Sequence, residues 1–253
     1  MGAGQMGAGI AQVAAQAGDE VLLHDVEQRF IDRGLQTIER NLSRAVDKGR
    51  MTEEQRGGVL AHIDSRLHWE DFEVDAAIEA ATENVLVKLD IFAKMDEYTP
   101  PTAILASNTS SISITKLGAA TTRPERVIGM HYFNPVPVMR LVEVIRGLAT
   151  SDATFEFVRD LAIRHGKTPV AANDYPGFIS NRILCPMLNE AVYTLYEGYG
   201  DPKYRPCPLL RNYVAAGWIG RKVGRGFYDY RGGAPKASVP PDGSARHAPA
   251  ARE

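Results

Sequence analysis

The first 172 residues alternate between two kinds of apolar pattern. Short apolar runs, typical of buried strands, occur at 20–24, 76–81, 103–106, 127–133, 141–145 and 167–171. Stretches with apolar residues three and four positions apart, typical of amphipathic helices, occur at 10–18, 26–48, 86–98 and 151–165. Strands that alternate with helices in this way predict an α/β fold built on a parallel sheet.

The runs 127–133 and 141–145 are joined by a turn-rich segment instead of a helix. This segment contains Pro135 and Pro137, and His131 and Glu143 each lie six residues from Pro137. A chain reversal there predicts a strand pair that brings the imidazole and the carboxylate together. Glu143 would orient one ring nitrogen and leave the other free to accept a proton. His131 is therefore the candidate general base.

The N-terminal glycines point to a dinucleotide. Residues 2–7, Gly-Ala-Gly-Gln-Met-Gly, satisfy the G-x-G-x-x-G pattern, and a helix and a strand ending at Asp25 follow. Such glycines let the backbone approach a pyrophosphate at a helix N-terminus, and Asp25 would bind a ribose hydroxyl and favour NAD over NADP. The alternative is that the small residues serve only helix–sheet packing. Only Met1 precedes the motif, so the strand that normally presents it is expected to be missing. The predicted cofactor contacts in this region are Gly2, Gly4, Gln5, Met6, Gly7 and Asp25.

Polar residues follow two of the predicted strands. Glu83 and Asn84 come after the run 76–81, and Asn108 and Ser110 come after the run 103–106. Ligands bind outside the carboxyl ends of parallel strands, so these side chains are candidate site residues. Helix capping and turn formation are an equally good explanation for each of them alone.

A break at 173–177, Asn-Asp-Tyr-Pro-Gly, predicts a domain boundary after residue 172. Residues 173–230 would form a smaller, helical domain, and residues 231–253, rich in Pro, Gly, Ala and Ser, a disordered tail. The first helix of the second domain carries an apolar stripe suited to a core or a subunit interface: Ile179, Ile183, Met187, Ala191 and Leu195.

Composition narrows the functional class. The net charge of −2 argues against a generally basic nucleic-acid binder, and no apolar run is long enough for a transmembrane helix. Two cysteines give no disulfide framework and suit a reducing compartment, so a cytoplasmic location is expected. No metal-ligand cluster is recognisable, and no metal is predicted.

Six segments together resemble the L-3-hydroxyacyl-CoA dehydrogenases, most closely the bacterial 3-hydroxybutyryl-CoA dehydrogenase group. They are Gly-Ala-Gly-Gln-Met-Gly-Ala-Gly-Ile-Ala (2–11), Ala-Ser-Asn-Thr-Ser-Ser (106–111), His-Tyr-Phe-Asn-Pro-Val-Pro (131–137), Leu-Val-Glu-Val-Ile (141–145), Asp-Tyr-Pro-Gly-Phe-Ile-Ser-Asn-Arg (174–182) and Gly-Arg-Gly-Phe-Tyr-Asp-Tyr (224–230). The resemblance covers nearly everything from Gly2 to Tyr230.

The resemblance implies a Rossmann-type domain joined to a smaller all-helical domain that mediates homodimerisation. It also implies oxidation of a 3-hydroxyacyl-CoA with NAD. In that mapping His131 is the base and Glu143 its orienting carboxylate, while Ser110 and Asn134 contact the substrate near the reacting oxygen. The resemblance further assigns Glu83 and Lys88 to the cofactor site and Lys48 to the CoA moiety.

Two other interpretations stay open, and two departures from the family, the missing first strand and a gap near 199–201, motivate the second of them. The family has a further helical stretch where Tyr199-Gly200 here runs directly into Asp201. One alternative is a dehydrogenase of the same fold that acts on a hydroxy acid or sugar acid without CoA. The other is a non-catalytic, nucleotide-binding remnant.

Overall fold

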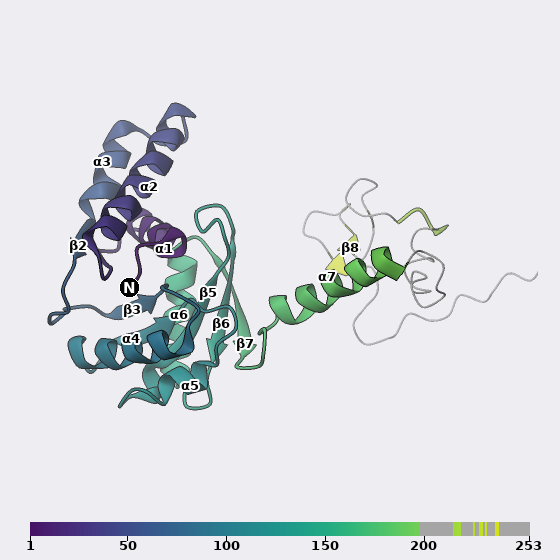
Figure 1. Cartoon of the computed structure of the whole chain (residues 1–253). Coiled ribbons are helices and arrows are strands. Elements are labelled where there is room, and N and C mark those ends of the chain that lie inside the picture. The colour runs from purple at the N-terminus through teal and green to yellow at the C-terminus, as the bar shows by residue number, and fades with distance from the viewer. Residues whose placement is uncertain (198–214, 219–224, 226–227, 230, 232–235, 238–253) are drawn as a thin grey trace, which may run out of the picture. The chain divides into compact units, whose positions relative to one another are not determined.

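The computed structural model describes residues 1–197, 215–218, 225, 228, 229, 231, 236 and 237 (Figure 1). The chain divides into two compact units, Met1–Pro186 and Met187–Glu253. The predicted gap near 199–201 and most of the predicted tail at 231–253 lie outside the described residues. Within the described part, no helix combines the length and the hydrophobicity needed to cross a membrane.

A five-stranded sheet forms the centre of the first unit. Its order is β3-β4-β5-β6-β7, with bounds Ala76–Glu79, Ile104–Ser107, Val127–Tyr132, Leu141–Arg146 and Thr168–Asn173. Neighbouring strands are parallel except β5 and β6, which pair antiparallel. The predicted chain reversal between 127–133 and 141–145 is thus confirmed, and it places His131 directly opposite Glu143 in the register.

Helices cover both faces of this sheet (Figure 1). On one face, residues of α1 (Gln5–Gln16) and α6 (Asp152–Arg164) pack with alternate strand residues such as Ile128 and Met130. On the other face, α4 (Val85–Tyr98) and α5 (Ile114–Gly118) pack with residues such as Leu105 and Ile145. The continuous apolar runs of β4 and β5 follow from this burial on both faces.

A second, two-stranded sheet pairs β1 (Val21–His24) with β2 (Ile63–Arg66). Met1 and Gly2 lie between β1 and β3, because Met1 hydrogen-bonds to Ile78 and Ala80 while the Gly2 amide donates to the His24 carbonyl. A cavity of about 550 Å³ adjoins this two-residue connection and is lined by β1, β3 and α1. Met1 and Gly2 therefore occupy the position between these two strands at which the motif predicts a longer strand.

The remaining helices are α2 (Gln28–Asp47), α3 (Glu53–Ala61), the 3₁₀ turn η1 (Pro124–Arg126) and α7 (Ser180–Glu197); two short strands, β8 (Tyr228–Asp229) and β9 (Lys236–Ala237), follow. Local sequence sets their starts. The Thr52 side chain accepts from the Gln55 amide while the Gln55 side chain accepts from the Thr52 amide, and these two bonds form a capping box at the start of α3. The Ser151 side chain caps α6 by accepting from the Thr154 amide.

The first compact unit extends beyond residue 172, where the sequence predicts a domain boundary. Phe178 is 5% exposed and packs in the core beneath α4 and α5. The Ser180 amide and hydroxyl bind the Glu143 carboxylate. These contacts tie the segment after β7 to the sheet.

Candidate active site

The glycine loop is shaped by contacts that only glycine allows. Gly2 has a φ of +94°, and a Cβ added at Gly7 would lie 1.8 Å from the Gly2 carbonyl oxygen. These two glycines therefore let α1 start directly against the loop. Gly4 is different, because an added Cβ would meet no atom within 4 Å. The loop at Gly4 consequently presents open backbone at the N-terminus of α1, as a pyrophosphate requires.

A cavity of about 760 Å³ adjoins this loop, and Gly2, Gly4, Gln5 and Asp25 all line it. Asp25 Oδ2 accepts a hydrogen bond from the Ala3 amide at 2.7 Å, and Oδ1 accepts from the Val26 amide at 2.7 Å. These bonds fix the carboxylate at the end of β1. The open loop, the helix N-terminus and the fixed carboxylate fit a dinucleotide with a free ribose hydroxyl.

His131 and Glu143 form a buried pair across β5 and β6. The distance between His131 Nδ1 and Glu143 Oε2 is 2.8 Å, and the two residues are 7% and 1% exposed. The His131 ring packs against Phe133 and Phe178, with ring centroids 4.6 and 6.0 Å away. Within the described residues, Nε2 of His131 makes no hydrogen bond. The paired nitrogen is thus held by the acid, and the other remains available.

Glu143 is itself held by the start of α7. Its Oε1 accepts from the Ile179 amide at 3.2 Å and from the amide and hydroxyl of Ser180 at 2.8 and 2.9 Å. Burial alone would raise the pKa of Glu143, but the hydrogen bonds from His131 and Ser180 outweigh it and hold the pKa below its ordinary value. Glu143 is therefore ionised at neutral pH.

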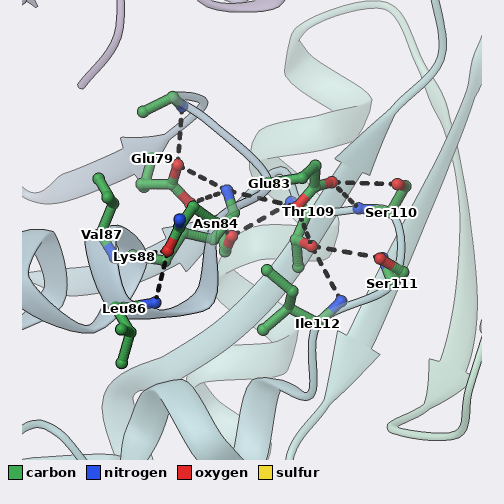
Figure 2. A network of polar contacts seen from close by, with 12 residues as sticks. Glu79, Glu83, Asn84, Leu86, Val87, Lys88, Thr109, Ser110, Ser111 and Ile112 are labelled. Carbon is green, nitrogen blue, oxygen red and sulfur yellow. Dashed lines mark hydrogen bonds and ion pairs between the residues drawn. The ribbon is translucent and has the colours of Figure 1, made fainter.

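Ser110 lies at the end of a polar network that Figure 2 shows. Glu83 Oε1 accepts from the Ser110 amide at 2.8 Å and from the Ser110 hydroxyl at 3.0 Å, while Oε2 accepts from the Thr109 hydroxyl at 2.8 Å. Burial would raise the pKa of Glu83, yet these bonds and the Lys88 charge lower it overall. Lys88 is almost fully buried, and its ammonium is 2.7 Å from both oxygens of Glu79.

The N-terminus of α7 joins the Ser110 loop to the His131–Glu143 pair. Ser180 binds Glu143, and the adjacent Asn181 donates from Nδ2 to the Ser110 carbonyl oxygen at 3.3 Å. Because Ser180 and Asn181 are consecutive, the two predicted catalytic elements lie beside one another. Asn108 adds a further link, since its Oδ1 accepts from the Tyr132 amide at the end of β5.

Three predicted contacts lie apart from these clusters. Asn134 is exposed on the loop after β5, and its side chain is hydrogen-bonded to none of the described residues. Lys48 is exposed at the C-terminal end of α2 and does not line the 760 Å³ cavity. Met6 packs against the core on the α1 side of the sheet. Their roles toward a ligand stay predictions.

Two residues of the site escape sequence reasoning. Glu79 stands inside a strand-like apolar run, and only its pairing with Lys88 reveals a polar function. Ser180 belongs to a segment that resembles the family, but its bond to Glu143 spans 37 residues. No local spacing signals either contact.

Comparison with known proteins identifies the family. Residues 1–175 match the model of the 3-hydroxyacyl-CoA dehydrogenase NAD binding domain, and residues 192–230 match that of the 3-hydroxyacyl-CoA dehydrogenase C-terminal domain. The chain is 47% identical to a probable 3-hydroxybutyryl-CoA dehydrogenase of Bacillus subtilis, covering 90% of this chain and 95% of that protein. That alignment spans 273 residues, more than the 253 of this chain, so the relative carries residues that this chain lacks.

Two further comparisons agree. A 3-hydroxybutyryl-CoA dehydrogenase of Bradyrhizobium diazoefficiens is also 47% identical, over 93% of this chain and 95% of that protein. The crystal structure of (S)-3-hydroxybutyryl-CoA dehydrogenase from Ralstonia eutropha superposes with a TM-score of 0.76, at 42% identity, covering 90% of this chain and 96% of that one. The chain therefore belongs to the 3-hydroxyacyl-CoA dehydrogenase family of NAD-dependent enzymes, and its first 175 residues are that family's NAD-binding domain.

Proposed function

We propose that this chain oxidises a short-chain L-3-hydroxyacyl-CoA to the 3-ketoacyl-CoA with NAD, and that His131 is the general base. The observation that carries this proposal is the buried 2.8 Å contact between His131 Nδ1 and Glu143 Oε2. The names of the relatives from B. subtilis and B. diazoefficiens, both 3-hydroxybutyryl-CoA dehydrogenases, support a short acyl chain on CoA.

The state of Glu143 determines which nitrogen of His131 can act. Because hydrogen bonds keep Glu143 ionised, the neutral imidazole carries its proton on Nδ1 and donates it to the carboxylate. Nε2 then has a free lone pair. When the C3–H electron pair leaves the substrate and the C3 carbonyl forms, Nε2 accepts the hydroxyl proton and Glu143 stabilises the resulting imidazolium.

The remaining residues have binding roles in this proposal. NAD, when bound, supplies the hydride acceptor. The loop at Gly2, Gly4, Gln5, Met6 and Gly7 would hold its pyrophosphate, with Asp25 on a ribose. Ser110 and Asn134 would position the substrate oxygen near the base, since small displacements there cost much of the rate. The resemblance assigns Glu83 and Lys88 to the cofactor and Lys48 to the CoA moiety.

Acetoacetyl-CoA-dependent oxidation of NADH tests the proposal. Substituting His131→Asn removes the base while keeping a polar side chain, and kcat should fall by about 10²- to 10⁴-fold. The matched control is His68→Asn, because His68 is exposed and outside the site. Retained turnover in His131→Asn would refute the role of His131. Equal rates with acetoacetate and acetoacetyl-CoA would favour the reading without CoA, and NAD binding without any turnover would favour the non-catalytic remnant.

We also propose that the chain forms a homodimer in the cytoplasm. Support for the dimer comes from the family resemblance and from exposed apolar side chains along α7, including Ile183, Met187 and Leu188. Exposed apolar residues that share a helix are typical of interfaces. Light scattering at micromolar concentration should give twice the chain mass, and a monomer mass that persists at high concentration would contradict the proposal.

A further inference from the structure

The Glu79 carboxylate is buried below the Ser110 loop and has no part in the proposed reaction. Its exposure is 0%, and it accepts four hydrogen bonds. Lys88 Nζ donates to both of its oxygens at 2.7 Å, the Ser107 hydroxyl donates to Oε2 at 2.7 Å and the Ala81 amide donates to Oε1 at 2.7 Å. A buried ion pair is seldom a net source of stability, because desolvation offsets the attraction. The Glu79–Lys88 ion pair at this edge of the sheet is therefore expected to have a role other than stabilising the fold.

The arrangement of charges indicates that role (Figure 2). Lys88 Nζ contacts Glu79 but is 3.8 Å from Glu83 Oε2, too far for a hydrogen bond. Both oxygens of Glu83 are instead taken by the loop, through the amide and hydroxyl of Ser110 and the hydroxyl of Thr109. The strong pairing with Glu79 thus holds the ammonium away from Glu83.

We propose that Glu79 is a positioning residue that acts through Lys88 on Ser110. Without the Glu79 charge, the Lys88 ammonium would move closer to Glu83, with which it already forms a 3.8 Å ion pair. It would then compete with the Thr109 hydroxyl for Oε2, turn the carboxylate and weaken the bonds of Ser110 to Oε1. The inference rests on the proposed function for its catalytic consequence, because there Ser110 positions the reacting oxygen.

Glu79 is also connected to the Ser110 loop by a second chain of hydrogen bonds, through Ser107. Removing that chain tests whether Glu79 acts on the loop through Lys88 or through Ser107. The Ser107 hydroxyl donates to Glu79 and accepts from the Thr109 amide at 3.1 Å. Ser107→Ala removes this route but leaves the ion pair intact. If Glu79 acts through Lys88, Ser107→Ala should change the loop far less than Glu79→Gln does.

Amide hydrogen exchange of the substrate-free protein gives a measurement that needs no activity. In Glu79→Gln, the Ser110 amide should exchange at least tenfold faster, because Glu83 no longer holds it. Amides of α6 in the same sample report global unfolding and should be unchanged. Exchange at Ser110 that stays at the wild-type rate in folded Glu79→Gln would overturn the inference, whatever the outcome for the proposed function.

Turnover supplies the second measurement. At saturating NADH, Glu79→Gln should lower kcat for acetoacetyl-CoA at least tenfold, while the exposed control Ser111→Ala should keep the wild-type rate. The double variant Glu79→Gln/Lys88→Met removes the ammonium that Glu79 restrains and also leaves no unpaired buried charge, so it serves if the single variant does not fold. Because Lys88 is assigned to the cofactor site, this variant is measured by amide exchange without ligands, and its Ser110 amide should exchange within about threefold of the wild-type rate. A double variant whose Ser110 amide exchanges as fast as in Glu79→Gln would overturn the inference, whereas an inactive wild type would bear only on the proposed function.

Discussion

Protonation of His24 should destabilise the folded protein in mild acid. The residue ends β1 and is 2% exposed, and its Nε2 has no hydrogen-bond partner among the described residues. Its ring packs against Trp69 and Phe72, with centroids 4.7 and 5.8 Å away. Burial lowers the pKa of His24 from 6.5 to about 4. The folded protein therefore keeps this ring neutral at a pH where the unfolded chain already binds a proton.

The sign and size of the effect follow from that difference. A lowered pKa in the folded state means that the stabilisation is complete above about pH 6.5 and is lost as the pH falls toward 4. A shift of about 2.5 pKa units corresponds to about 3 kcal/mol in total, of which about 2 kcal/mol is lost between about pH 7.5 and pH 5.

Urea titrations at pH 7.5 and pH 5 measure this loss as a change in the free energy of unfolding. His24→Phe places a third aromatic ring beside Trp69 and Phe72 and removes the titration. The variant should therefore lose about 2 kcal/mol less than the wild type between the two pH values. The control is His68→Gln: His68 is exposed and its charge is only a minor cause of the lowered pKa of His24, so nearly all of the wild-type loss should persist. Equal losses in wild type and His24→Phe would refute the reasoning.

Three other substitutions follow from single contacts. Gly9→Ala would place a Cβ 2.8 Å from Val136 Cβ, on the loop that carries Asn134. The loop would have to shift, so kcat/KM for acetoacetyl-CoA should fall at least tenfold in steady-state kinetics. An unchanged kcat/KM would mean that the loop position does not matter. Asp25→Ala removes the carboxylate at the ribose site and should lower the NAD-over-NADP ratio of kcat/KM at least tenfold, whereas an unchanged ratio would contradict its role. Gly57→Ala, on α3, meets no atom within 4 Å and should raise the free energy of unfolding by about 0.5–1 kcal/mol at unchanged turnover; lower stability in urea would contradict this.

The elements that the sequence predicts share strong local signals. The β5–β6 pair is predictable because two apolar runs flank prolines, and the equal distances of His131 and Glu143 from Pro137 give the register. The missed elements β2 and α5 lack such signals. Strand β2 exposes alternate residues, including Asp64 and Arg66, and its four residues carry little apolar pattern. Helix α5 has only five residues.

Parts of the site that the sequence does not predict depend on contacts distant in the chain. The Glu79 partner Ser107 is 28 residues away, and Ser180 is 37 residues from Glu143. The residue types at these positions are compatible with a strand and with a helix start, so each has an adequate local explanation. Only the fold brings the pairs together. The resemblance to the family names His131 and its orienting carboxylate Glu143, but not Ser180 or Glu79, which bind Glu143 and Lys88.

The supports of the proposed proton transfer all lie in one compact unit. His131 and Glu143 sit on β5 and β6, and the bonds that hold Glu143 come from Ile179 and Ser180, before the unit ends at Pro186. The network at Ser110 and the glycine loop belong to the same unit. The match to the family's C-terminal domain, in contrast, begins at residue 192. Among the described residues, every contact that holds Glu143 and orients His131 comes from the first unit, so we expect the state of the proposed base to be set there.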